Sequence, residues 1–118
     1  MELSHLPVID WDLGKKLAGN RPDLAKEILS FLVKRVSDDL ALIKYLYDQG
    51  NQAELLRQIH KLHGALCYCG VPRLQILAGR LEMDLKSHIM THLKSLLDQL
   101  EIEVAILLEH YTDLECHA

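Results

Sequence analysis

The chain has 118 residues, a length that fits one domain with a single modest core. Apolar residues make up 49% of it and charged residues 25%, which is typical of a globular chain and excludes an intrinsically disordered one. The net charge of −4 and the lack of a long apolar run argue against a polybasic nucleic-acid or membrane patch and against a membrane span.

Scarce aromatic residues and abundant Leu, Ala, Glu and Lys favour helices over strands. The first predicted helix covers residues 10–18, with the carboxylate of Asp10 at its N-terminus. The second covers residues 22–48, with Pro22 in the first-turn position that suits proline and Gly50 beyond its end. Apolar residues recur along this second helix at helical spacing, namely Leu24, Ile28, Leu32, Val36, Leu40, Ile43 and Tyr47.

A third helix is predicted over residues 52–69, where Asn51 and Glu54 resemble a capping box. The fourth and fifth helices are predicted over residues 72–86 and 92–113, each with leucine at helical spacing. Four amphipathic helices with short connections predict an all-α fold, an antiparallel four-helix bundle (up-down-up-down). The short N-terminal helix would cover one end, and the whole chain would form one domain.

The stretch "IHKLHGALCYCG" places a glycine inside the third predicted helix. A buried stripe is predicted there from Leu55, Ile59, Leu62, Leu66 and Cys69. His60 lies roughly 140° from that stripe and faces solvent, with Arg57, Lys61 and Gly64 on the same outer face and His63 at its boundary. Helical side chains lean toward the N-terminus, so residue 64 would cover His60, and glycine there costs about 1 kcal/mol relative to alanine. We interpret Gly64 as access to His60; close packing of another backbone is the alternative.

The third and fourth helices form a predicted hairpin that brings Glu82 beside His60. A carboxylate that accepts a hydrogen bond from one imidazole nitrogen fixes the tautomer and leaves the other nitrogen free as a nucleophile. A solvated surface position is the alternative for Glu82.

Arg57, Lys61 and His63 could place positive charge around a phosphoryl group on His60. The glycines match neither GxGxxG nor GxxxxGK[ST], so we expect no ATP site and no autonomous kinase activity.

The segment "IHKLHGALCYCGVPRL" resembles the phosphoacceptor motif H-x-L-K-G-[SA] of histidine-containing phosphotransfer (HPt) domains. His60 matches the phosphorylated histidine and Gly64 the motif glycine. His63 replaces the usual lysine, so its help to the phosphoryl group could depend on pH. The resemblance is strongest to the C-terminal HPt domain of hybrid sensor histidine kinases of the BarA/GacS type, which have "LHG" and "GVPR" at these places.

The resemblance implies a four-helix bundle with a short N-terminal helix. It also implies a phosphohistidine that exchanges phosphoryl groups with the aspartate of response-regulator receiver domains. No bound cofactor is expected, and the partner receiver would supply Mg²⁺. Glu82 matches the position at which related domains carry a Gln or Glu bonded to the imidazole.

The cysteines, the N-terminal sequence and the charged outer positions indicate the cellular context. Three cysteines without a CxxC pair do not make a disulfide framework, and the N-terminus lacks the order of a signal peptide. We therefore expect reduced thiols and a cytoplasmic location. The resemblance implies that the parent kinase, if there is one, lies at the cytoplasmic face of the inner membrane. The mainly charged outer positions predict a monomer without nucleic-acid or direct membrane contact.

A receiver domain also needs an apolar surface to dock on. Five residues flank the face of His60 by spacing, although core packing is the preferred interpretation for most of them: Leu56, Cys67, Tyr68, Val71 and Ala78. Gly79 either allows close approach of helices near His60 or is incidental.

A metal site is the main alternative function, because the chain has seven histidines and three cysteines. The pairs with usable positions are His60 with His63, His88 with His92, and Cys116 with His117. The facing Glu-x-x-His pairs of ferritin-like sites are not found. A purely structural interaction bundle is the second alternative, but it would need a large apolar outer face.

Overall fold

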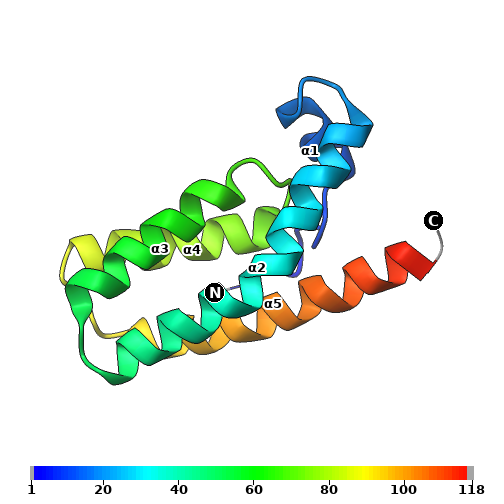
Figure 1. The fold of residues 1–118 in the computed structure, drawn as a ribbon. Helices are drawn as coiled ribbons and strands as arrows, with labels where there is room; N and C mark the ends of the chain where they lie inside the picture. Colours follow the sequence, from blue (N-terminus) through cyan, green and yellow to red (C-terminus); the bar gives the residue numbers. More distant parts are fainter. Residues whose placement is uncertain (1, 117–118) are drawn as a thin grey trace.

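The computed structural model describes residues 2–116, with side chains through residue 114. The described chain forms the helices α1 (Trp11–Leu17), α2 (Pro22–Asp48), α3 (Gln52–Leu66), α4 (Pro72–Lys86) and α5 (Leu93–Cys116). Helices α2 to α5 each pack against the next, and α5 closes the ring against α2, while α1 lies beside the N-terminal part of α2 (Figure 1). The prediction of an all-α four-helix bundle with a short N-terminal helix is confirmed.

The helices begin where the sequence offers capping groups. The carboxylate of Asp10 accepts from the backbone N–H of Leu13 at 3.0 Å, and the side chain of Asn51 accepts from that of Glu54 at 3.2 Å. Proline occupies the first turn of both α2 and α4, where its missing N–H costs no hydrogen bond.

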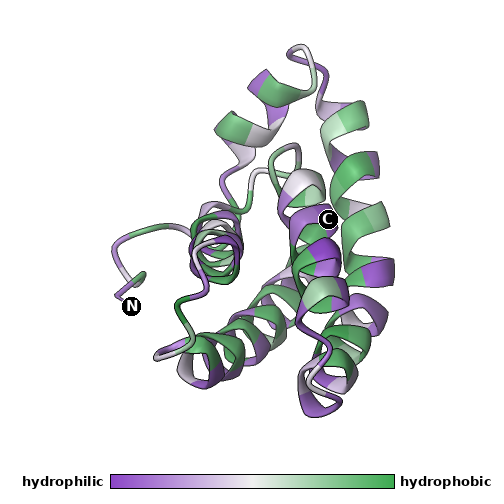
Figure 2. Cartoon of the chain, turned by 90° about the vertical axis from the view of Figure 1, so that its left-hand side faces the viewer, coloured by the Kyte–Doolittle hydropathy of each residue, from purple (hydrophilic) through white to green (hydrophobic). Residues whose placement is uncertain are grey.

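The core is made from the apolar stripes of the four long helices. All five residues of the predicted stripe near His60 are buried, namely Leu55, Ile59, Leu62, Leu66 and Cys69. Each helix shows hydrophobic and hydrophilic sides in Figure 2, as burial of one face requires. No helix among residues 2–116 is long and apolar enough to cross a membrane.

Three helices differ from the expected ranges: α1 is one residue shorter at each end, α3 differs at its C-terminal end and α5 differs at both ends. Helix α3 ends at Leu66, short of residue 69, because the backbone N–H groups of Tyr68 and Cys69 bond three residues back, to Ala65 and Leu66, and tighten the chain into a turn. Helix α5 starts at residue 93 and continues to residue 116, beyond the expected end at residue 113.

The turn between α3 and α4 is held by α1. Gly70 has a φ of +68°, and its carbonyl accepts from the backbone N–H of Asp10 at 2.8 Å. A Cβ at residue 70 would lie 2.8 Å from the carbonyl oxygen of Asp10 and 2.9 Å from the Cα of Gly14. Only glycine therefore lets the backbones of α1 and of this turn meet so closely.

We predict that Gly70→Ala lowers the free energy of unfolding by about 2–4 kcal/mol. The substitution imposes a strained left-handed conformation, worth about 1–2 kcal/mol, and adds a collision with α1 worth about 1–2 kcal/mol more. Gly50→Ala is the matched control, because Gly50 has the same φ of +68° but has nothing within 4 Å of its added Cβ. Equal losses for the two variants in denaturant unfolding would contradict the collision with α1.

Candidate functional site

His60 stands on the outer face of α3 with open space beside it. Its side chain is 69% exposed. Gly64, one turn further along the helix, is also exposed, and a Cβ added there would meet nothing within 4 Å. Within residues 2–116 no other backbone packs against this glycine, so the geometry favours access to His60 over close packing.

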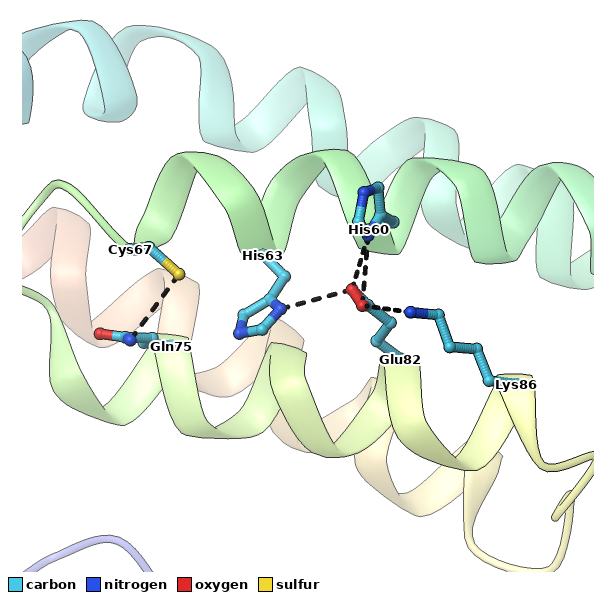
Figure 3. A network of polar contacts seen from close by, with 6 residues as sticks. All are labelled: His60, His63, Cys67, Gln75, Glu82 and Lys86. Atoms are coloured by element: carbon cyan, nitrogen blue, oxygen red, sulfur yellow. Dashed lines mark hydrogen bonds and ion pairs between the residues drawn. The ribbon is translucent and has the colours of Figure 1, made fainter.

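Glu82 reaches His60 from α4, as the predicted hairpin requires (Figure 3). The Nδ1 of His60 lies 2.9 Å from Oε1 of Glu82 and 3.2 Å from Oε2. Because an ionised carboxylate only accepts hydrogen bonds, Nδ1 carries the proton and donates it. In the neutral ring Nε2 is then unprotonated, and it lies on the side of the ring away from the carboxylate. A directed nucleophile results at an exposed position.

Two more donors converge on the same carboxylate. The Nδ1 of His63 lies 3.3 Å from Oε1 of Glu82, and the Nζ of Lys86 lies 3.3 Å from Oε2. Lys86 was not among the predicted site residues, although the i,i+4 spacing of Glu82 and Lys86 is typical of a helical ion pair. His63 was expected to support a phosphoryl group directly, whereas its ring is turned toward α4.

The carboxylate of Glu82 is charged despite its burial. Its side chain is only 9% exposed, and this burial raises the pKa. Hydrogen bonds from His60, His63 and Lys86 outweigh the desolvation, so the pKa of Glu82 lies below its ordinary value. The site therefore holds a fixed negative charge directly beneath His60.

The remaining predicted cations lie at the margins of the site. Arg57 pairs with Glu54 on its own helix at 2.6 Å, and its side chain is 71% exposed. Lys61 points to the other side of α3, where it lines a groove against α2. Their approach to a phosphoryl group on His60 stays a prediction.

The groove between α2 and α3 has a volume of about 310 Å³ and borders the His60 face through Lys61 and Ala65. Its apolar lining consists of Ile28, Phe31, Leu32, Leu62, Ala65, Tyr68 and Cys69, and its polar lining of Arg35, Asp39, Gln58 and Lys61. Phe31 is 59% exposed and Tyr68 is 64% exposed, so two aromatic side chains face solvent here.

The expected docking residues therefore separate into three groups by exposure. Tyr68 is exposed in the groove, whereas Val71 and Ala78 are fully buried core residues, as the preferred interpretation had it. Leu56 and Cys67 are partly buried. Phe31 was missed, although a phenylalanine beside rather than on the apolar stripe of α2 is itself a sign of an exposed aromatic.

The metal alternative gains no support from the described residues. Among them, no group of three or more His, Cys, Asp or Glu side chains is arranged to hold a metal ion. His88 and His92 lie in the connection between α4 and α5, where His88 has a φ of +57°, so they do not share a helix face. The side chain of Cys116 and all of His117 lie outside the described residues.

Comparison with known proteins identifies relatives of this arrangement. The family model of the Hpt domain matches residues 27–110. The sensor histidine kinase GacS of Pseudomonas protegens is 40% identical over 82 residues, which cover 70% of this chain and 9% of that protein. The histidine-protein kinase BarA of Escherichia coli K12 is 33% identical over 79 residues, covering 67% of this chain and 9% of that protein.

A solved structure matches nearly the whole chain. It is the crystal structure of the HPT domain from an Hpt sensor hybrid histidine kinase from Shewanella, with a TM-score of 0.84 and 30% sequence identity. The match covers 94% of this chain and 96% of the other. The chain thus spans about 9% of the length of the kinases it resembles, but nearly all of a separately solved domain.

We predict that acid destabilises the protein partly through Glu82. Because the folded-state pKa of Glu82 is lowered, its contribution to stability is present above the unfolded-state pKa and is lost as pH falls from about 5 to about 3. Glu82→Gln should flatten the fall of unfolding free energy over this range. Glu101→Gln is the control, because that carboxylate is 49% exposed. If the unfolding free energy of Glu82→Gln fell with pH as steeply as that of the wild type, this role of Glu82 would be ruled out.

Proposed function

The chain belongs to the Hpt domain family, and we propose from this premise that His60 is the residue that carries the phosphoryl group. The domain is a histidine phosphotransfer module of a two-component phosphorelay. The observation that carries the assignment of His60 is its hydrogen bond to Glu82, 2.9 Å long, which leaves Nε2 of an exposed imidazole free.

The proposed step is a direct displacement at phosphorus. The lone pair of His60 Nε2 attacks the phosphorus of an aspartyl phosphate on the partner, and the P–O bond to the aspartate breaks with its electron pair left on that carboxylate. The phosphorylated ring keeps its proton on Nδ1 and carries a positive charge, which Glu82 stabilises across the hydrogen bond. The reverse step passes the phosphoryl group to a second aspartate.

Other parts of the reaction come from the partner. Phosphoryl transfer needs mainly positioning and neutralisation of charge, which Arg57 and Lys61 would support from the margins of the site. We propose that the partner supplies Mg²⁺ and the opposing carboxylate, because the sequence carries no Gly-rich nucleotide motif. No resident cofactor is required.

The proposed partners are receiver domains of response regulators, and the groove between α2 and α3 is the proposed docking surface. It adjoins His60, it exposes Phe31 and Tyr68, and Lys61 and Arg35 add positive charge that suits an acidic receiver site. The resemblance to GacS and BarA suggests a relay within hybrid sensor kinases on the cytoplasmic side of the membrane.

We predict that His60→Gln abolishes phosphoryl acceptance and leaves the fold intact, because the side chain is largely exposed. The measurement uses a receiver domain loaded with ³²P and Mg²⁺. Wild-type protein should gain acid-labile, base-stable label, and the variant should gain none. Label on His60→Gln would show that another residue carries the phosphoryl group.

We predict that Gly64→Gln blocks transfer without destabilising the protein. A longer side chain at this position covers His60, while replacement of a helical glycine stabilises the helix by up to about 1 kcal/mol. Gly64→Ala is the matched control, because it gives a similar helix gain with little coverage and should slow transfer much less. Wild-type transfer by Gly64→Gln would refute the role of Gly64 as an open approach.

We predict that Phe31→Ala raises by about tenfold the receiver concentration that gives half-maximal transfer, as expected for truncation of an aromatic contact. Tyr45→Ala is the matched control, because Tyr45 lies on the same helix, is also 59% exposed and does not line the groove. Equal effects in the two variants would place the receiver elsewhere.

A further inference from the structure

The ring of His63 occupies a space that Gly79 leaves open between α3 and α4. A Cβ at residue 79 would lie 3.2 Å from Nε2 of His63 and 3.5 Å from Cε1. The first distance is tighter than ordinary van der Waals contact and the second lies within it, so the ring would have to shift by a few tenths of an ångström if residue 79 carried a side chain. Gly79 is therefore not incidental, and the neighbour it accommodates is a side chain and not a helix backbone.

Both nitrogens of His63 face α4. Nδ1 lies 3.3 Å from Oε1 of Glu82, and Nε2 lies against Gly79. Figure 3 shows the ring directed across the helix boundary, with the dashed contact running to the carboxylate. Neither nitrogen is directed outward toward the position of a phosphoryl group on His60. In this position His63 acts on Glu82.

Glu82 needs such a support. A glutamate side chain has several rotatable bonds, and the direction of its carboxylate decides which way the ring of His60 is held. Lys86 also contacts the carboxylate, but its long side chain is 58% exposed and loses much rotamer freedom when held. The ring of His63 is 30% exposed, has two rotatable bonds and is confined between two helices. It is therefore the stiffer of the two supports.

We propose that His63 is a positioning residue for phosphotransfer. Its ring lies in the space that Gly79 leaves open and holds the carboxylate of Glu82 beneath His60. This inference rests on the proposed role of His60. His63 then acts on Glu82 and does not support the phosphoryl group directly.

A double-mutant cycle tests whether Gly79 affects transfer through the ring of His63. The single-turnover rate of transfer from a phosphorylated receiver domain would be measured for the wild type, Gly79→Val, His63→Ala and the double variant. Each single substitution should slow transfer about fivefold, the rate equivalent of one hydrogen bond. The double variant should be no slower than His63→Ala, because alanine leaves room for valine. Losses that multiply in the double variant, or an unchanged rate in His63→Ala, would overturn the proposal.

A second measurement reads the imidazoles without phosphotransfer. Long-range ¹H–¹⁵N correlation spectra distinguish the protonated ring nitrogen from the bare one. In the wild type both His60 and His63 should carry the proton on Nδ1. In His63→Ala and Gly79→Val the Nδ1-protonated share of His60 should fall. An unchanged tautomer of His60 in both variants would overturn the proposal.

The outcomes separate this inference from the function on which it rests. Label on His60→Gln would refute the phosphoryl-carrying role of His60. The spectra would still show whether His63 and Gly79 control the tautomer of His60. Loss of label in His60→Gln together with wild-type rates and tautomers in the other variants would refute only the positioning role. If Gly79→Val fails to fold, Gly79→Ala takes its place, because its Cβ alone reaches the ring at 3.2 Å.

Discussion

A carboxylate at the packed boundary of two helices must be satisfied by donors, because an unpaired buried charge costs far more than a hydrogen bond gains. Glu82 meets that requirement with one side chain from its own helix and two from its neighbour. The donors from the neighbour are imidazoles, so satisfying the charge also determines which nitrogen of His60 is left free. Stability and reactivity at this site thus depend on the same contacts.

That contact requires α3 and α4 to keep a fixed register over about three turns from their connection. The turn between α3 and α4 fixes this register through Gly70. The close contact of Gly70 with the backbone of α1 leaves little freedom for α3 or α4 to slide. The short N-terminal helix is therefore more than a cover over the end of the bundle. It contributes to the alignment of His60 with Glu82 from a distance along the chain.

Much of this arrangement is readable from the sequence, because helical periodicity determines which residues are buried. The stripe through Ile59 and Leu62 fixes the outward direction of His60, and similar spacing from the turn pairs His60 with Glu82. What periodicity does not determine is the rotamer of a boundary residue. His63 lies where its ring can turn to solvent or to α4, and the space beside Gly79 together with the hydrogen bond to Glu82 decides between them. The exposed Phe31 was missed for a related reason, since the groove depends on how far apart α2 and α3 pack.

The occupied carboxylate has a consequence for how long a phosphoryl group persists on the domain. A carboxylate offers about four lone-pair sites, and Glu82 makes four contacts, two through His60 and one each through His63 and Lys86. It therefore has little capacity left to take a proton from a water molecule that approaches phosphorus. Under the proposed role of His60, Glu82 would stabilise a phosphorylated imidazole without promoting its hydrolysis, so the phosphoryl group would persist on an exposed side chain.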